Sequence, residues 1–385
     1  MGFKIEKILV TKLDADGNIP ANPVLLNVCF EEFTLKDVKK FDDFGCLTKD
    51  GKITTETGSD IEGGAKIRLD AQTMPFIMTH MIGQVTSTTD TVAVDWAAAT
   101  VTTKGTIVNH SDGKHSLVCM STKGDGKTGA VEPATTSKTV QDGNVKWVVV
   151  NKLLTQVYKM SDTCPLFAVE YKLTDGTNDF YKRFTGGELS ALPININGES
   201  STYEIDFDFK CAKVTDNQKS DWTSNLEAIA GAQLVSLGRD FYGGACELSK
   251  IYINNVAIED TESVSMTIDK QIESKSYVNC QKSNKRDLKV DGELKEDFSI
   301  ERYNMASDND HFELKMEINT RVGAKATFEF KDVYRSAIDP DLVKKTDITL
   351  SPKLTAMEKS PNKIVEATII APSLIADDGT VIGAY

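Results

Sequence analysis

The stretch from residue 203 to residue 211, YEIDFDFKC, alternates strictly between apolar and polar side chains. The apolar members are Tyr203, Ile205, Phe207, Phe209 and Cys211. The polar members are Glu204, Asp206, Asp208 and Lys210. Because a period of two places successive side chains on opposite faces of a β-strand, this pattern predicts one dry face and one acidic, water-facing face.

An internal repeat constrains the arrangement of the remaining strands. The pattern apolar, acidic, Gly, any, apolar, Lys occurs as IEGGAK at 61–66 and as VDGELK at 290–295. Three further matches keep the same order along the chain: 33–35 with 264–266, 167–174 with 312–319, and 184–191 with 330–337. The sequence therefore predicts two copies of one module, the first at about 24–84 plus 152–215 and the second at about 245–372.

We predict a mainly β protein with two duplicated β-barrel or β-sandwich modules, short helices and a small β insertion. Two helices are expected: Gln72–Ile82, ended by Gly83, and Asp221–Gly238, which carries apolar residues at helical spacing. The Thr-, Ser- and Gly-rich stretch 85–150 contains short strand-like runs and has no counterpart in the second copy. The predicted units are a discontinuous first module (1–84 and 151–220), the insertion (85–150), a linker helix (221–239) and a second module (240–385).

Two polar segments of similar length, 40–60 and 270–288, are predicted to be loops without secondary structure of their own. Long loops of this kind are uncommon unless they are functional, so we expect them to contact neighbouring subunits. The alternative is a surface hairpin. The candidate contact residues are Asp42, Asp43, Lys49, Asp50, Lys52, Lys275, Lys282, Lys285 and Arg286.

Composition excludes several classes of protein. The net charge of −13 repels phosphate backbones, so sequence-independent nucleic-acid binding is not expected. The seven cysteines are an odd number without a CxxC pair, which indicates reduced thiols rather than a disulfide framework. The N-terminal stretch lacks the apolar core of a signal peptide, and no membrane-spanning apolar run is present, so no contact with a membrane is expected.

Motifs for catalysis or metal binding are weak. The GDGKT run at 124–128 lacks the first glycine of a phosphate-binding loop, because Ser121 stands there, and a surface turn explains it better. His110, His115 and Cys119 do not have the spacing of a metal site. The loop at 14–18 lacks the glycine and glutamate of a calcium-binding hand. With four histidines and no recognisable nucleophile motif, we expect no enzyme, no cofactor and no metal.

The order of these segments resembles the tail tube proteins of long-tailed bacteriophages. The resemblance lies in the φ-acid-Gly strand, a short helix, FTGGELSALPININ at 184–197, and YEIDFDFK at 203–210. The second half, with SVSMTIDK at 263–270 and DGELKEDFSIERYNM at 291–305, is similar to the same family. The resemblance covers nearly all of the chain except the N-terminus and the 85–150 insertion.

The resemblance implies a structural subunit that forms stacked rings around a channel for DNA, with one helix outside the barrel. It implies acidic lumenal residues, for which the candidates are Glu204, Asp206, Asp208, Glu62 and Asp291. Three chains would supply six modules per ring. The implied partners are further copies of the chain, the tape measure protein and DNA in the lumen, and tail terminator and distal tail proteins at the ends. The implied location is the virion tail, assembled in the host cytoplasm.

Two other classes of function remain open from the sequence. One is a β-sandwich carbohydrate-binding or adhesive module of a surface assembly, and a weaker one is a hydrolase without a recognisable motif. For Glu204, Asp206 and Asp208, the alternative to a lumenal position is an ordinary solvated strand on the exterior.

Overall fold

The computed structural model describes most of the chain, and the following statements concern only the residues it describes. These are 4–28, 30–44, 53–83, 85–91, 94–161, 164–175, 177, 179–197, 203–211, 213–216, 225–238, 240–243, 248–259, 261–270, 272–277, 280–285, 289–297, 311–336, 349–356 and 364–385. The protein is mainly β, with 62% of residues in strands and one α-helix in this part of the chain. The predicted fold class is confirmed at this level.

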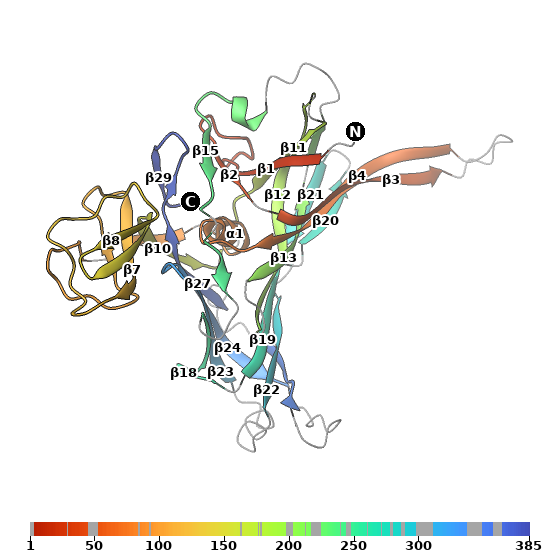
Figure 1. The fold of residues 1–385 in the computed structure, drawn as a ribbon. Coiled ribbons are helices and arrows are strands. Elements are labelled where there is room, and N and C mark those ends of the chain that lie inside the picture. The colour runs from red at the N-terminus through yellow and green to blue at the C-terminus, as the bar shows by residue number, and fades with distance from the viewer. Residues whose placement is uncertain are drawn as a thin grey trace.

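Most strands belong to one large sheet that passes through the body of the molecule (Figure 1). Seven of them, which we call the first strand set, are β1 (Lys4–Lys12), β3 (Phe30–Phe44), β4 (Ile53–Arg68), β11 (Phe167–Thr174), β12 (Asp179–Asn197), β13 (Glu204–Cys211) and β14 (Lys213–Asp216). β12 is central to this set. Its N-terminal half pairs with β11 and β14, and its C-terminal half pairs with β13. β4 then joins β13 to β3, and β1 lies beside β11.

A second group of seven strands is paired in the same order. This second strand set consists of β17 (Ser249–Ile253), β19 (Thr261–Asp269), β22 (Lys289–Asp297), β23 (His311–Thr320), β24 (Lys325–Arg335), β26 (Lys353–Ala356) and β27 (Val365–Pro372). β24 takes the place of β12, because it pairs with β23, β27 and β26. β22 joins β26 to β19, and β17 lies beside β23.

The two strand sets also agree in register. Phe33 lies opposite Ala65 in β3 and β4, and Val264 lies opposite Leu294 in β19 and β22. Further pairs follow the same rule, so residues at matching positions have partners on corresponding strands of the two sets. The corresponding pairs are Gly63–Phe209 with Gly292–Leu354, Leu189–Phe209 with Arg335–Leu354, Val169–Phe184 with Leu314–Phe330, and Phe184–Val214 with Phe330–Val365.

Both sets contain the same β-bulge in their longest strand. The register of β11 against β12 shifts after Phe167, and that of β23 against β24 shifts after the matching Phe312. The extra residue has a positive φ in both places: 70° at Gly186 and 56° at Asp332. A bulge bends a strand and increases its twist, which is why β12 and β24 can each pair with different partners along their two halves.

The strand sets are joined edge to edge. The C-terminal half of β12 pairs with β19, from Ala191–Asp269 to Asn197–Ser263. A second joint is formed by β10 (Leu153–Lys159), which pairs with β27 on one edge and with β5 (Val85–Asp90) on the other. The large sheet also contains β2 (Val24–Asn27), β15 (Gln233–Ser236), β16 (Tyr242–Gly243), β18 (Val256–Ala257) and β25 (Thr349–Leu350).

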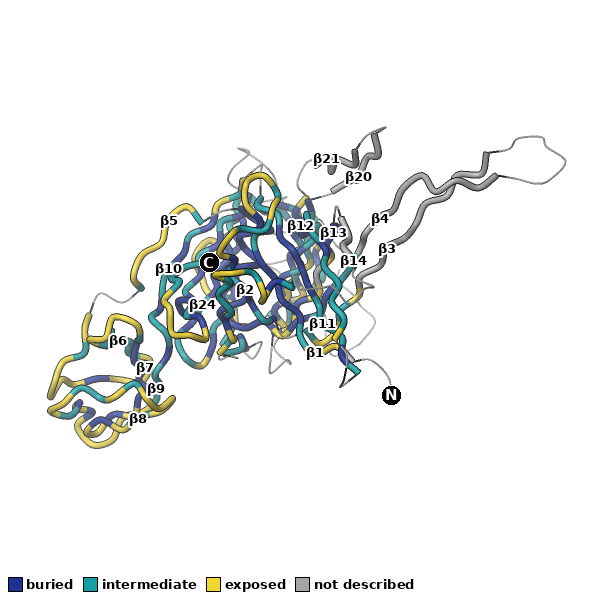
Figure 2. Tube along the Cα trace, turned by 90° about the horizontal axis from the view of Figure 1, so that it is seen from above, coloured by how far each residue is buried: buried dark blue, intermediate teal, exposed yellow. Residues whose placement is uncertain are grey.

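The buried residues gather in the body of the molecule (Figure 2), and the main core cluster includes helix α1 (Thr73–Met81). Asp70 accepts hydrogen bonds from the backbone N–H groups of Gln72 and Thr73, which stabilise the start of this helix. The chain leaves the helix at Gly83, whose φ is 140°. The predicted helix at 72–82 is therefore confirmed. All nine of its residues are buried, because it packs on the dry face of the sheet rather than on an outer surface.

The helix predicted at Asp221–Gly238 is wrong over the residues that the structure describes there. Residues 226–228 form a short 3₁₀ turn, η1 (Leu226–Ala228), and residues 233–236 form β15, parallel to β2. Gly231 has a φ of 82°, which interrupts the helical spacing. The apolar residues still reach a core, since Leu226, Ile229 and Leu234 cluster with Leu9 and Leu25.

The two segments predicted to be loops are hairpins, which corrects the prediction. β3 and β4 remain paired from the body out to Phe44–Ile53, and Figure 1 shows this ribbon extending well away from the body. At about 3.4 Å per residue, the part of β3 beyond Leu35 spans about 30 Å. The second segment contains β20 (Ile272–Tyr277) and β21 (Cys280–Lys285), which form their own two-stranded sheet. These segments lack the apolar alternation of a core strand, so their sequence resembles that of a loop.

The 85–150 stretch contains a separate four-stranded sheet in the order β6-β7-β9-β8. Its strands are β6 (Ile107–Asn109), β7 (His115–Thr122), β8 (Thr139–Asp142) and β9 (Val145–Asn151). One face buries a small core around Trp147, and the other packs on Val322 and Ile370 of the body. Figure 1 places this unit on the side of the body opposite the β3–β4 hairpin. A last two-stranded sheet joins β28 (Leu374–Ile375) to β29 (Val381–Gly383).

Candidate functional site

The acidic alternation of β13 is present in the structure as two distinct faces. Glu204, Asp206 and Asp208 are exposed, whereas Tyr203, Ile205, Phe209 and Cys211 are buried. Phe209 packs against Phe33 and Phe167, with ring centroids 5.9 and 6.1 Å apart. The burial of these rings fixes the register of the strand, since a slip by one residue would bury the carboxylates.

The exposed side of β13 continues across the neighbouring strands as one polar face. Strand pairs place Asp206 beside Lys66 of β4, Asn195 of β12 beside Ser265 of β19, and Asp291 of β22 beside Thr355 of β26. The described acidic side chains on this face are Glu32, Glu188, Glu204, Asp206, Asp208, Asp269, Asp291 and Glu293. The described basic ones are Lys66, Arg68, Lys210, Lys289, Lys295 and Lys353. We call this surface the polar face.

Cations and carboxylates alternate on the polar face. Lys66 Nζ lies 3.1 Å from Glu204 Oε2, and Arg68 Nε lies 3.9 Å from Glu204 Oε1. The hydrogen bond with Glu204 raises the pKa of Lys66, and the hydrogen bond with Asp291 raises that of Lys289. The face is therefore not a uniformly acidic wall. It holds an excess of carboxylates over cations, with many hydroxyl and amide side chains between them.

The structure brings four of the five predicted lumenal carboxylates onto this one face. Glu204, Asp206 and Asp208 lie on β13, and Asp291 lies on β22, where Thr355 Oγ1 donates a hydrogen bond of 2.9 Å to its Oδ1. The backbone of Glu62 pairs with Lys210, but its side chain lies outside the described part of the structure. The sequence analysis missed the contribution of β12 and β19, although the alternation of Ser263, Ser265 and Thr267 with apolar residues was a usable signal.

The predicted contact residues of the two long segments lie on the hairpins or outside the described residues. Asp42 and Asp43 belong to β3, Lys275 to β20, and Lys282 and Lys285 to β21, in each case by backbone only. Lys49, Asp50, Lys52 and Arg286 lie outside the described residues.

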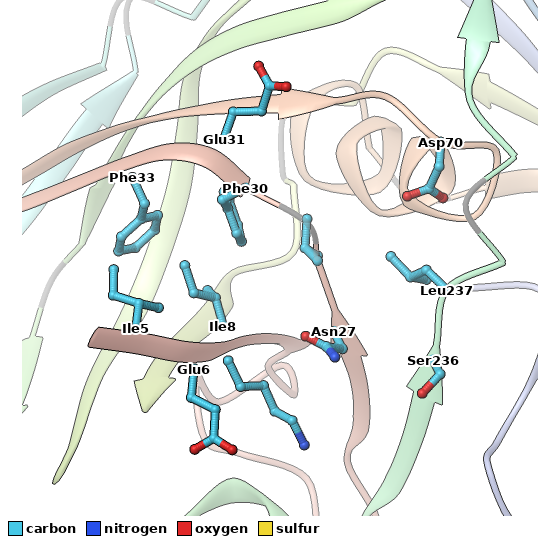
Figure 3. Close-up of a pocket in the computed structure, with 12 residues that line it drawn as sticks. Ile5, Glu6, Ile8, Asn27, Phe30, Glu31, Phe33, Asp70, Ser236 and Leu237 are labelled. Atoms are coloured by element: carbon cyan, nitrogen blue, oxygen red, sulfur yellow. The ribbon is translucent and has the colours of Figure 1, made fainter. Parts of the chain in front are cut away.

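A groove of about 490 Å³ opens beside β3, between the two layers of the first strand set (Figure 3). Phe30 and Phe33 of β3 face Ile5 and Ile8 of β1 across it. Ile5 is 51% exposed, which is high for an isoleucine. The buried Asp70 lies at the far end, where burial raises the pKa of its carboxyl despite hydrogen bonds from Thr73 and Gln72. The apolar residues make this a candidate contact surface that sequence reasoning did not find.

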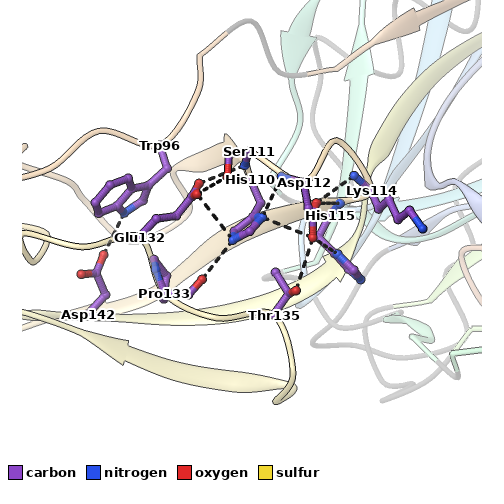
Figure 4. A network of polar contacts seen from close by, with 10 residues as sticks. All are labelled: Trp96, His110, Ser111, Asp112, Lys114, His115, Glu132, Pro133, Thr135 and Asp142. Carbon is purple, nitrogen blue, oxygen red and sulfur yellow. Dashed lines mark hydrogen bonds and ion pairs between the residues drawn. The ribbon is translucent and has the colours of Figure 1, made fainter.

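A polar network holds together the loops of the four-stranded sheet (Figure 4). His115 Nδ1 lies 2.6 Å from Asp112 Oδ2, and His110 Nε2 donates to the carbonyl oxygen of Pro133 at 3.0 Å. Burial alone would raise the pKa of Asp112, but hydrogen bonds from His115 and Lys114 lower it far below its ordinary value. These contacts tie residues 110–115 to residues 132–135, so we assign the network to the stability of the loops.

Asp142 is the other polar centre of this sheet. Its Oδ2 accepts hydrogen bonds from the indole N–H groups of Trp96 and Trp147, at 2.9 and 3.0 Å. Its Oδ1 accepts from the backbone of Gly129. A buried carboxylate with three donors is satisfied and has a structural role.

Cys119 does not join the two histidines, because it lies in the buried core of the four-stranded sheet. Within the residues that the structure describes, no group of three or more His, Cys, Asp or Glu side chains is arranged to hold a metal ion. The GDGKT run forms turns, with Asp125 accepting from the amide of Asn144 and from the backbone of Lys127. In the same described ranges, no helix has the length and apolarity needed to cross a membrane.

The chain matches no protein-family model and no curated protein sequence.

Proposed function

We propose that the chain is a structural subunit of a hollow tube of the phage tail tube type, in which the polar face lines a channel for DNA. One observation carries the proposal: two strand sets with the same pairings, registers and bulge are joined edge to edge in one sheet. A duplicated module that extends its own sheet sideways is the repeating unit of a closed barrel.

The chemistry of the polar face fits a passage for DNA. A wall that exposes more carboxylates than cations repels the phosphate backbone, so DNA moves along it without adsorption. The interleaved Lys66, Arg68 and Lys289 partly neutralise the carboxylates, which limits repulsion between neighbouring subunits. The buried face of the same sheet carries α1 and the core, which supports a channel on the polar side.

In this proposal three chains form one ring, because each chain carries two strand sets. The ring has true threefold and approximate sixfold symmetry, and stacked rings extend it into a tube. The β3–β4 and β20–β21 hairpins reach neighbouring rings. The lumen holds the tape measure protein and then DNA, while tail terminator and distal tail proteins occupy the ends. The location is the virion tail.

Electron microscopy of the purified full chain tests the assembly. We expect rings or hollow tubes, with three chains per ring in an image reconstruction. Six chains per ring, with one strand set of each lining the channel, would overturn the threefold arrangement. A stable monomer that binds glycans would instead favour a carbohydrate-binding or adhesive β-sandwich.

Charge reversal tests the position of the polar face. We expect tubes assembled from the triple variant Glu204→Lys, Asp206→Lys and Asp208→Lys, in the presence of short duplex DNA, to retain DNA that nuclease cannot digest. A matched control reverses three exposed acids elsewhere, at Asp16, Asp95 and Glu259. That control should bind only DNA that nuclease digests. Nuclease-sensitive DNA on the polar-face variant would place these residues on the exterior.

A further inference from the structure

We propose that the cleft between the body and the inserted unit, residues 85–150, binds one ring of a neutral sugar. The cleft has a volume of about 320 Å³. Gln72, Gly238 and Asp240 line it from the body, and His115 and residues 135–138 line it from the inserted unit. A volume at the lower end of the range for small-molecule sites suits a single ring. The site goes beyond the proposed tube and does not depend on it.

Gln72 offers an unused hydrogen-bond donor in this cleft. The residue immediately precedes α1 and is only 5% exposed. Its Oε1 accepts a hydrogen bond of 2.6 Å from the backbone N–H of Gly238, which leaves the Nε2 group to donate. In the part of the chain that the structure describes, no group accepts from this Nε2. Because buried amide groups are normally paired, a ligand hydroxyl that accepts from Nε2 supplies what the site lacks.

Asp240 offers the complementary acceptor. Its side chain is 18% exposed, and the one described partner of its carboxylate is Lys138, whose Nζ lies 3.6 Å from Oδ1. Burial raises the pKa of Asp240, and Lys138 lowers this pKa by less. The carboxylate therefore has few donors to stabilise its charge.

The amide and the carboxylate lie close enough together to serve one ligand. A Cβ placed on Gly238 would lie 3.3 Å from Gln72 Oε1 and 3.6 Å from Asp240 Oδ2. Each hydroxyl group can both donate and accept a hydrogen bond. Adjacent hydroxyls of a sugar ring can therefore donate to Asp240 and accept from Gln72 at the same time.

The inserted unit adds further polar groups to the cleft. The Nδ1 atom of His115 lies 2.6 Å from Asp112 Oδ2, and Figure 4 shows the ring held beside that carboxylate. Among the described residues, its Nε2 has no hydrogen-bond partner, so this atom is left for a ligand. Thr136 and Ser137 are exposed and contribute hydroxyl groups. The network around Asp112 thus also positions a side chain that lines the cleft.

The charges of the cleft favour a neutral ligand. Among the described residues that line it, Lys138 is the one Lys or Arg side chain and Asp240 the one carboxylate, and the two face each other. The cleft therefore has no net charge to attract a phosphate or an amine. Val149 and Pro372 add apolar surface, which suits the C–H face of a sugar ring.

The first test fills the cleft. Ser137→Trp places an indole there, and Thr139→Trp is the matched control, since Thr139 is also exposed but does not line the cleft. Saturation-transfer NMR of the full chain uses the methyl glycosides of glucose, galactose, mannose, rhamnose and N-acetylglucosamine. At least one should bind, and its signal should vanish for Ser137→Trp and remain for Thr139→Trp. Binding of none of these sugars, or undiminished binding by Ser137→Trp, would overturn the proposal.

The second test removes the acceptor. Asp240→Asn keeps the shape of the side chain but replaces a carboxylate oxygen with a donor, so the sugar that binds should bind at least about tenfold more weakly. Asp95→Asn, at an exposed residue outside the cleft, should bind like the unsubstituted chain. Thermal unfolding checks that both variants are folded. Equal affinities of the two variants would overturn the role of Asp240, and tighter binding of glucuronic acid than of the neutral sugars would overturn the choice of a neutral ligand.

Sugar binding and tube assembly can fail separately. Hollow tubes that bind none of these sugars would refute the site and leave the tube proposal standing. A stable monomer that binds a sugar, and loses it in Ser137→Trp, would support the site and refute the tube.

Discussion

The first and second strand sets share a backbone plan but differ in what packs on it. In the first set, α1 covers the dry face, and the ring of Phe76 contacts Phe167 with centroids 5.6 Å apart. In the second set, the corresponding Phe312 lies beside the guanidinium of Arg335, 5.2 Å from the ring centroid. The pairings, registers and bulge are nonetheless the same. The two sets therefore share their strand pairings, although different side chains pack on the strands.

The outer edges of the two sets differ as well. The edge of β19 is covered by β12, whereas β3 pairs only with β4 in the described ranges. β27 of the second set pairs with β10, which lies in the first half of the chain, just before β11. The chain therefore joins its two halves through two strand joints, β12–β19 and β10–β27.

The largest change in unfolding free energy is expected at one pair of matching positions. The first set buries Leu189 there, and the second set buries Arg335. Leu189 is fully buried, and a Leu189→Arg variant would place a charge without a partner in the core beside Phe209. We expect a loss of about 4 kcal/mol or more in unfolding free energy. Arg335→Leu, the reverse exchange at the matching position, should remain folded. Chemical denaturation measures both, and equal losses would show that the two positions are not equivalent.

The second-largest change in unfolding free energy is expected at the residue that pairs with Phe167 or with the matching Phe312, next to the β-bulge. It is Gly187 in the first set and Val333 in the second. A Cβ on Gly187 would lie 2.7 Å from the Phe167 ring, which cannot move because Phe76 and His80 pack against it. Gly187→Val should therefore lower the unfolding free energy by about 2–3 kcal/mol. A near-neutral result would show that α1 does not hold the ring in place.

The sequence predicted the secondary structure best where a segment carries a clear pattern of buried apolar residues. β13 was predicted because its apolar residues keep a strict period of two, and α1 because its stretch is apolar and ends at Gly83. The β3–β4 hairpin was missed because its sequence at 36–60 lacks such a period. The helix predicted at 221–238 was wrong over residues 225–238, because Gly231 has a positive φ and residues 233–236 pair in parallel with β2. The groove beside β3 was not predictable, since it is formed by residues far apart in the sequence.

A smaller effect is expected at the bulge itself. Gly186 and Asp332 adopt positive φ values, which glycine tolerates and most other residues do not. Gly186→Ala should lower the unfolding free energy by about 1 kcal/mol. The matched control is Gly187→Ala, which tests crowding rather than φ. Thermal unfolding compares them, and no change for Gly186→Ala would contradict the positive φ as a requirement of the bulge.

The smallest effect compares an inverted charge pair on β11 and β23. Glu170 and Lys172 of the first set correspond to Lys315 and Glu317 of the second. Burial raises the pKa of Glu170. The backbone N–H of Leu226 and the guanidinium of Arg183 lower this pKa by less, so it lies above its ordinary value. Burial would also raise the pKa of Glu317, but hydrogen bonds from Lys325 and Lys315, each with Nζ 2.9 Å from Oε1, lower it.

These shifts predict opposite pH dependences for the two glutamates. Because its folded pKa is lowered, Glu317 contributes stability above the ordinary carboxyl pKa of about 4.3, and this contribution is lost as the pH falls below that value. Because its folded pKa is raised, Glu170 contributes stability that is present below about pH 4.3 and is lost as the pH rises toward its folded pKa. We expect this from urea unfolding between pH 3 and pH 7, compared with the unsubstituted protein. The unfolding free energy of Glu317→Gln should fall less as the pH is lowered, and that of Glu170→Gln should fall less as the pH is raised. The same change of slope in both variants would contradict the inversion.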